Sequence, residues 1–470
     1  MKTTFKYLCM GAMMLSISAP AAAQDGSKAD VDALKVLIAN KQTDAKSLKP
    51  FYNKNKKNGE NLTAFGRAFM EAKDTANARI YAEHAMKLKY APAYVLRGDL
   101  YALAEDGGAA AQMYDQAIYF DDKNPEAYRK YASVYRKISP AGAVAKLNEL
   151  REKVPGYPVD ALVGHINYIS NNFDEAIAAY EKVDRSQLQK MDMIEYATSC
   201  YFTGKYDKGL DMAKYGLQKE PRNSTMNRMA MFCNTEKENY AEALEYADRL
   251  FNKSDSANIS YMDYVYYGNA LNGNKQHDEA IAMFKKALQQ EFDNKDKRAG
   301  VVQTLANAYK GMGNYPEAIK YYGQYLNEVS KASASDYHSF AQLHVQHANT
   351  LEGDAKAETF KKADDIYAGM QQKYADIDDF ISFQRARIGM YMDPESKQEL
   401  AKPHYEKMIE VLEARTDRSK SDTNHLIEGY RYLINYYLNI KDDAATAKTI
   451  AEKLQGVDPE NEIAKMVLGL

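Results

Sequence analysis

The chain has 470 residues, of which 45% are hydrophobic and 27% are charged, and these proportions are normal for a globular protein. Its formal net charge of −3 provides no basic excess, which excludes general recruitment of nucleic acid through released counterions. Tyrosine is unusually common, with 38 residues, whereas tryptophan is absent.

The first residues resemble a secretory signal peptide. Lys2 and Lys6 form a short positive region, an apolar stretch follows from Tyr7 to Ala19, and Ala21–Ala23 provide small residues for cleavage. The apolar stretch is too short to span a membrane as a helix. Residues 1–23 are therefore predicted to be a cleaved signal peptide.

A lipid anchor is not expected after this segment. Bacterial lipoproteins need a cysteine at the cleavage site, whereas Cys9 lies inside the apolar stretch. No later segment of the sequence is apolar enough over sufficient length to span a membrane. We therefore expect a periplasmic or secreted protein with no membrane span.

Residues 24–60 are predicted to form an N-terminal helical cap, and residues 61–255 a regular repeat array. Each repeat is centred on a small residue with aromatic residues at fixed distances; around Ala110, for example, Tyr101 lies nine positions before and Tyr114 four after. Consecutive small residues are 32 to 34 positions apart. They are Ala78, Ala110, Ala143, Ala176, Gly209 and Ala243.

This pattern resembles the tetratricopeptide repeat, in which aromatic, Leu-Gly, Tyr, Ala, Phe, Ala and Pro positions recur over 34 residues. The resemblance implies an all-α fold, a right-handed superhelical solenoid of about eleven stacked antiparallel helix hairpins. Small residues such as Gly98 and Ala110 allow the paired helices to approach closely, and the tyrosines fill the grooves beside them. The tyrosine excess is largely explained by this packing role.

Residues 256–470 are predicted to form a second array with longer, irregular repeats. From Ala243 onward the small residues are 37 to 46 positions apart, and polar stretches near Ser330 and Thr416 contain the additional residues. We place a soft boundary near Ser254–Ser260. The later small residues are Ala280, Ala318, Ala363, Ala401 and Ala447.

The sequence contains no convincing catalytic motif. Gly268 and Gly273 have the spacing of a phosphate-binding loop, but Asn274 follows where a lysine is required. Both glycines also fall on repeat positions, so they are interpreted as packing and turn residues. We expect no enzymatic activity and no cofactor.

Three histidines, His338, His344 and His347, lie within ten residues of one another. On one straight helix His338 and His347 face opposite sides, so the three cannot bind one metal together. No metal site is predicted, although two of them completed by a distant carboxylate remain an alternative.

Two further points stay open in the sequence. Cys200 and Cys233 lie one repeat apart, which allows either a disulfide or, as we favour, two buried thiols. Thr75 and Ser256 each stand between Asp and Ala, a short pattern that resembles a bacterial O-glycosylation signal and that also arises by chance.

In a solenoid of this family the first helix of each hairpin lines the concave surface. Its exposed positions include arginines that suit carboxylates and amides that suit a peptide backbone. Val265 replaces the lysine of the family's carboxylate clamp, so that specificity is not expected. The candidate partner-binding residues are Arg129, Arg136, His165, Tyr168, Tyr201, Arg228, Asn269, Asn272, Gln303, Asn307 and Lys310.

The sequence therefore predicts a non-catalytic scaffold of the bacterial cell envelope that binds a protein or peptide partner in its concave groove. The alternative is a periplasmic protein that binds a glycan or nutrient on the same scaffold. The absence of tryptophan removes the usual best platform for stacking sugars, although tyrosine can replace it.

Overall fold

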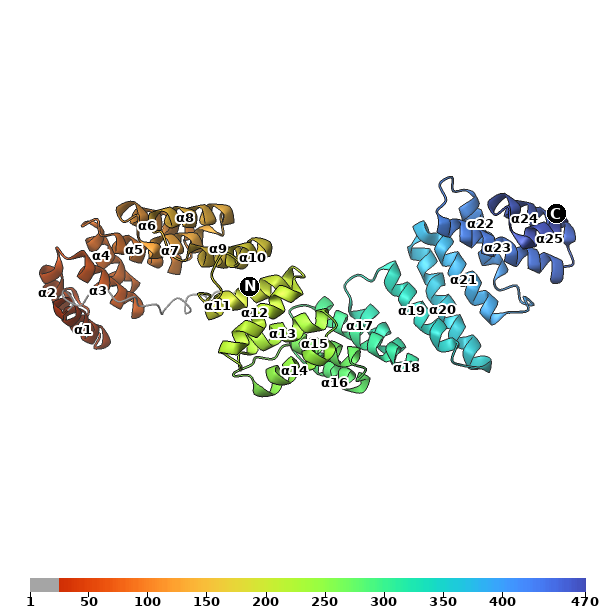
Figure 1. The fold of residues 1–470 in the computed structure, drawn as a ribbon, viewed down its shortest axis with the longest axis horizontal. Coiled ribbons are helices and arrows are strands. Elements are labelled where there is room, and N and C mark those ends of the chain that lie inside the picture. The colour runs from red at the N-terminus through yellow and green to blue at the C-terminus, as the bar shows by residue number, and fades with distance from the viewer. Residues whose placement is uncertain (1–24) are drawn as a thin grey trace. The chain divides into compact units, whose positions relative to one another are not determined.

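A computed structural model describes residues 25–470 (Figure 1). The predicted signal peptide, residues 1–23, lies outside this range. The described residues form helices and contain no β-strand. They divide into two compact units, one ending at Glu220 and one comprising Pro221–Leu470, which we call unit 1 and unit 2.

Unit 1 begins with two helices, followed by five hairpins in which each helix packs mainly on the next one in the chain. Its helices are α1 (Asp25–Ala39), α2 (Ala45–Asn55), α3 (Gly59–Glu71), α4 (Thr75–Met86), α5 (Ala91–Leu103), α6 (Gly107–Phe120), α7 (Pro125–Tyr135), α8 (Pro140–Lys153), α9 (Val159–Ile169), α10 (Phe173–Tyr180), α11 (Lys190–Phe202) and α12 (Tyr206–Lys219).

Unit 2 contains six hairpins and a short final helix. Several of its helices are long, which accounts for the wider repeat spacing: α20 has 21 residues and α23 has 20. The helices are α13 (Ser224–Glu236), α14 (Tyr240–Asp248), α15 (Tyr261–Gly273), α16 (His277–Ala287), α17 (Lys295–Gly311), α18 (Tyr315–Glu328), α19 (Ala334–Ala348), α20 (Gly353–Lys373), α21 (Asp378–Met392), α22 (Lys402–Glu413), α23 (Lys420–Asn439), α24 (Ala444–Val457) and α25 (Glu462–Leu468).

The prediction of an all-α solenoid built from stacked hairpins is confirmed for the described residues. The divisions predicted at residue 60 and near residues 254–260 remain predictions. The second of these positions lies inside unit 2, where a short π-helical turn, Arg249–Lys253, follows α14.

Small residues sit at the helix crossings because large rings occupy the space beside them. A Cβ atom added to Gly98 would lie 2.4 Å from the ring of Tyr114, and one added to Gly164 would lie 2.7 Å from the ring of Tyr180. Real Cβ atoms do not come this close to other heavy atoms. Glycine on the first helix is therefore the steric counterpart of tyrosine on the second.

The turn between α17 and α18 illustrates how the hairpins are closed. Gly313 adopts a left-handed conformation with φ of 74°, which glycine reaches without steric cost. The side chain of Asn314 then accepts a hydrogen bond from the backbone N–H of Glu317 at 3.4 Å and caps α18. Pro316 in the first turn of α18 needs no hydrogen-bond acceptor for its nitrogen.

Both cysteines of the described range are buried thiols. Burial raises the pKa of Cys200 to about 12, so its thiol stays protonated. The interpretation as packing residues fits these positions. Within residues 25–470 no helix combines the length and the apolar character needed to cross a bilayer.

Candidate binding surface

The first helices of the hairpins present one surface in each unit, and we call the surfaces of the first helices the first-helix face. Each of α3, α5, α7 and α9 contacts the first helix of the next hairpin, ending at α11. In unit 2, α13 contacts α15 in the same way. The candidate residues predicted from the sequence lie on or directly after first helices, from α7 in unit 1 to α17 in unit 2.

A network of charges joins three first helices of unit 1. Asp99 on α5 accepts a hydrogen bond from Lys130 Nζ on α7 at 2.6 Å and lies 3.9 Å from Arg67 on α3. Glu126 on α7 lies 3.0 Å from Lys130 and 3.5 Å from Arg67. Opposite charges thus neutralise one another here and fix the relative positions of α3, α5 and α7.

A buried carboxylate lies further along the same face. Glu195 on α11 is 4% exposed, and both its oxygens lie 2.9–3.0 Å from Nδ1 of His165 on α9. The hydroxyl of Tyr180 on α10 donates to the same carboxylate at 2.5 Å. The candidate His165 is therefore a structural partner of Glu195 as well as a half-exposed surface group.

The two predicted arginines of α7 differ in their surroundings. Arg129 is exposed, and no hydrogen bond or ion pair engages its guanidinium among the described residues. Arg136 is half-buried and donates from Nη1 to the carbonyl of Ile169 at 3.3 Å. Burial lowers the pKa of Arg136. Of the two, Arg129 has its guanidinium open to a partner.

Two predicted tyrosines stand at the turn ends of their hairpins in unit 1. The ring of Tyr168 lies 6.0 Å from Phe173, and the ring of Tyr201 lies 5.4 Å from Phe202. Phe173 and Phe202 stack on each other at 4.9 Å between ring centroids. Both predicted tyrosines thus belong to a packed aromatic row.

Arg228 on α13 is engaged within unit 2. Its Nε and Nη2 atoms donate to the two oxygens of Asp263 at 2.5 and 3.0 Å, and Nη2 also donates to the carbonyl of Asn258 at 2.8 Å. The side chain of Asp263 is fully buried. A bidentate pair of this kind leaves Arg228 little capacity for an external carboxylate.

The amides predicted on α15 and α17 are partly engaged. Asn272 lies 2.8 Å from Nδ1 of His277, and Gln303 donates to the hydroxyl of Tyr322 at 3.4 Å. Asn269 is half-buried, whereas Asn307 and Lys310 on α17 are exposed. Asn307 and Lys310, one turn apart, are therefore the open polar groups of this set.

The three clustered histidines of α19 have different neighbours. His338 Nδ1 lies 2.7 Å from the hydroxyl of Tyr367, His344 is buried against Phe340, and His347 stacks on Tyr315. Burial lowers the pKa of His344 to about 4, with Lys362 and His347 adding unfavourable positive charge. Among residues 25–470 no group of three potential ligands is positioned to hold a metal ion.

The structure reveals a further row of polar contacts, which we call the tyrosine row. Its tyrosines lie four positions after the small residue of the second helix, and their hydroxyls reach polar groups of first helices. The pairs are Tyr114–Asp99 at 2.8 Å, Tyr180–Glu195 at 2.5 Å, Tyr322–Gln303 at 3.4 Å, Tyr367–Gln342 at 3.0 Å and Tyr405–Glu428 at 2.9 Å.

Sequence reasoning explained these tyrosines by packing alone and missed their hydrogen-bond partners. The sequence did contain a signal. Phe284 fills the same repeat position and is buried without a hydroxyl, so packing alone does not require tyrosine there. A buried phenol requires a hydrogen-bond partner, and the polar first-helix face supplies one. Burial and the adjacent Asp99 raise the pKa of Tyr114, which keeps its hydroxyl a donor.

Comparison with known proteins identifies the repeat. Residues 271–342 match the tetratricopeptide repeat family. No curated protein matches the chain.

Solved structures with a similar architecture include the C-terminal part of a tetratricopeptide repeat-containing protein from Cytophaga hutchinsonii. It is 23% identical with a TM-score of 0.48, over 59% of this chain and 100% of that one. Another is a tetratricopeptide repeat protein from Parabacteroides merdae, 17% identical with a TM-score of 0.37, over 53% of this chain and 98% of that one.

Proposed function

Since residues 271–342 match the tetratricopeptide repeat family, we propose that the chain is a non-catalytic scaffold that binds a protein or peptide partner on its first-helix face. The observation that carries the proposal is the tyrosine row. Hydroxyls from the second helices hold carboxylates and amides of the first helices in fixed positions. Groups fixed before binding lose little conformational entropy when a partner arrives.

The open groups beside these fixed positions define the chemistry of the partner. Arg129 offers a planar guanidinium to a carboxylate in unit 1. Asn307 and Lys310 in unit 2 offer an amide and an ammonium group. Such groups suit an extended peptide with acidic side chains, whose backbone amides bond to side-chain amides.

We also propose that the protein acts in the cell envelope. This rests on the sequence of residues 1–23, with its positive region, apolar stretch and small-residue cleavage site. Fractionation of the native host, together with N-terminal sequencing, tests it. A mature protein beginning near Gln24 in the periplasm or medium is expected, and an intact N-terminus in the cytoplasm would contradict it.

The binding proposal is tested by crosslinking and mass spectrometry in the native host. The variants Arg129→Glu and Asn307→Ala/Lys310→Ala change only exposed side chains, so the fold is expected to persist. The matched control is Lys448→Glu, an exposed charge on the second helix α24.

A crosslinked protein partner is expected with the wild type and the control, and its yield should fall with at least one variant of the first-helix face. Equal yields from all variants would reject this face as the binding surface. Saturable binding of a glycan in the absence of any protein partner would instead favour the sugar-binding alternative.

A further inference from the structure

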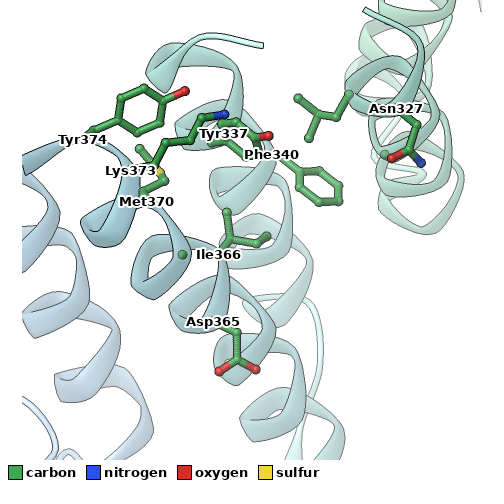
Figure 2. Close-up of a pocket in the computed structure, with 11 residues that line it drawn as sticks. Asn327, Tyr337, Phe340, Asp365, Ile366, Met370, Lys373 and Tyr374 are labelled. Atoms are coloured by element: carbon green, nitrogen blue, oxygen red, sulfur yellow. The ribbon is translucent and has the colours of Figure 1, made fainter. Parts of the chain in front are cut away.

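A groove of about 530 Å³ lies between α18, α19 and α20 in unit 2 (Figure 2). Its apolar lining includes Leu326 on α18, Phe340 on α19, and Ile366 and Met370 on α20. Figure 2 shows the side chain of Phe340 pointing from α19 toward α18, the helix that carries Asn327. Although α19 is a first helix, none of these residues is among the candidate partner-binding residues of the first-helix face.

Two glycines keep the groove open. Gly369 stands inside the 21-residue helix α20, where glycine is less favourable than alanine. A Cβ atom added there would meet no heavy atom within 4 Å, so close packing does not require the glycine. On the facing wall, a Cβ added to Gly323 would make only an ordinary contact, 3.6 Å from Phe340. Larger residues at these positions would fill the groove.

The charge of the groove is positive at one end. Lys373 Nζ lies 4.9 Å from the ring centre of Tyr337 and 5.4 Å from that of Tyr374. No ion pair joins Lys373 to a carboxylate within residues 25–470. At the other end Asp365 is paired with Lys361 at 3.0 Å, so its charge is already neutralised. The groove therefore combines an apolar floor with one uncompensated ammonium group.

We propose that this groove is a second docking site, for a peptide that inserts a bulky apolar side chain between α18 and α20 and places a neighbouring carboxylate at Lys373. The exposed rims at Gly369 and Lys373 leave the groove open along α20, which suits a chain passing through it. The charge of Lys373 selects an acidic peptide over a basic one. This site goes beyond the proposed function, since its lining residues on α18, α19 and α20 differ from the residues proposed to bind the partner on the first-helix face.

A phage-displayed library of random linear peptides, panned on the whole mature chain, tests the site. Counter-selection uses Gly369→Leu, whose Cβ meets no heavy atom within 4 Å and whose larger side chain would occupy the groove. Its matched control is Gly456→Leu, at an exposed glycine of α24 that also has no heavy atom within 4 Å of an added Cβ. The enriched peptides are then synthesised, and their dissociation constants are measured by fluorescence anisotropy.

The enriched peptides are expected to carry a bulky apolar residue next to Asp or Glu. Gly369→Leu should weaken their binding by at least about tenfold, because the apolar side chain loses its burial. Lys373→Glu should weaken it by about fivefold, whereas Gly456→Leu and Lys448→Glu should not change it. Changes confined to Arg129 or Lys310 should also leave it unchanged, which separates this site from the first-helix face.

Three results would overturn the proposal. Enriched peptides without an acidic residue would remove the role of Lys373. Peptides that bind Gly369→Leu as tightly as the wild type would place the site elsewhere. A dimer in sedimentation velocity that Gly369→Leu converts to a monomer would identify a second copy of the chain as the occupant of the groove.

Discussion

At the scale of single residues, the fold depends on complementary pairs of a glycine and an aromatic ring. Gly98 and Tyr114 form one such pair, in which the ring also donates its hydroxyl to Asp99 on the polar side. Packing and polarity are thus satisfied by one side chain. This explains why tyrosine, with an apolar ring and a polar tip, is so common in the repeats.

Replacing Gly98 by alanine should destabilise unit 1. The new Cβ would lie 2.4 Å from the ring of Tyr114, which is only 2% exposed. A loss of about 1–3 kcal/mol in the free energy of unfolding is expected from such overpacking. Urea denaturation followed by circular dichroism measures it.

Gly456→Ala is the control for Gly98→Ala. An added Cβ meets no heavy atom within 4 Å at this helical position, so a gain of about 0.5–1 kcal/mol is expected from helix propensity. Equal stability of Gly98→Ala and the wild type would show that the crossing is not close-packed.

His344 should make unit 2 sensitive to mild acid. Burial lowers its pKa to about 4 in the folded state, against about 6.5 in the unfolded chain. Above pH 7 both states are neutral there and the residue has no effect on pH dependence. As pH falls below 6.5 the unfolded state gains a proton that the folded state does not, so folding is weakened by about 2 kcal/mol at pH 5.

His344→Leu keeps a side chain of similar size and cannot be protonated, so it should remove this part of the acid sensitivity. Urea midpoints of the wild type and the variant at pH 7 and pH 5 make the comparison. The difference between the two proteins should grow as pH falls. A constant difference would mean that His344 is protonated equally in both states.

Sequence periodicity located the small residues and their aromatic neighbours because their chemistry follows from the distance between two helices. The same reasoning placed the candidate residues on first helices but could not show which ones are already engaged. Arg228 illustrates the reason: its partner Asp263 lies on the next hairpin, beyond any local pattern. The partners of Tyr180 and Tyr405 were missed for the same reason, since both tyrosines reach the following hairpin, where they contact Glu195 and Glu428.

At the scale of helices, acidic residues in the first turn link capping to packing. Asp263 accepts hydrogen bonds from the backbone N–H and the hydroxyl of Ser260, which forms a capping box at the start of α15. The same carboxylate receives the guanidinium of Arg228 from α13. One buried side chain therefore both begins a helix and joins it to the preceding hairpin.

Arg228→Leu should lower the free energy of unfolding of unit 2 by about 3 kcal/mol, because it leaves a buried carboxylate without its counter-charge. Arg129→Leu is the matched control and should change stability by less than about 0.5 kcal/mol, since Arg129 is exposed. Thermal unfolding of the two variants gives the comparison. A similar, small effect of both would show that the capping bonds of Ser260 suffice for Asp263.

At the scale of the whole molecule, each hairpin contacts mainly its neighbours, within two compact units. In such an arrangement a local defect weakens adjacent hairpins and is not transmitted along the chain. Each hairpin therefore contributes to the stability of its unit mainly through its contacts with adjacent hairpins. The binding surfaces proposed here, on first helices and on the α18–α20 side, can consequently be altered one at a time.

Hydrogen exchange of Gly98→Ala tests this locality. Backbone amides of α5 to α7 should lose protection, because their packing on Tyr114 is disturbed, while amides of α21 to α24 in unit 2 should exchange as in the wild type. Mass spectrometry of peptic fragments resolves the two regions. A uniform loss of protection along the chain would show that the two units unfold together.

The tyrosine row also limits how such a chain can evolve by duplicating or deleting repeats. Tyr180 and Tyr405 find their acceptors, Glu195 and Glu428, in the hairpin that follows their own. Removing or inserting one hairpin at either place would put a different side chain beside the buried hydroxyl, which would then lose its hydrogen-bond acceptor. The hairpins are therefore not interchangeable modules, and a change in repeat number would have to be accompanied by substitutions at the new junction.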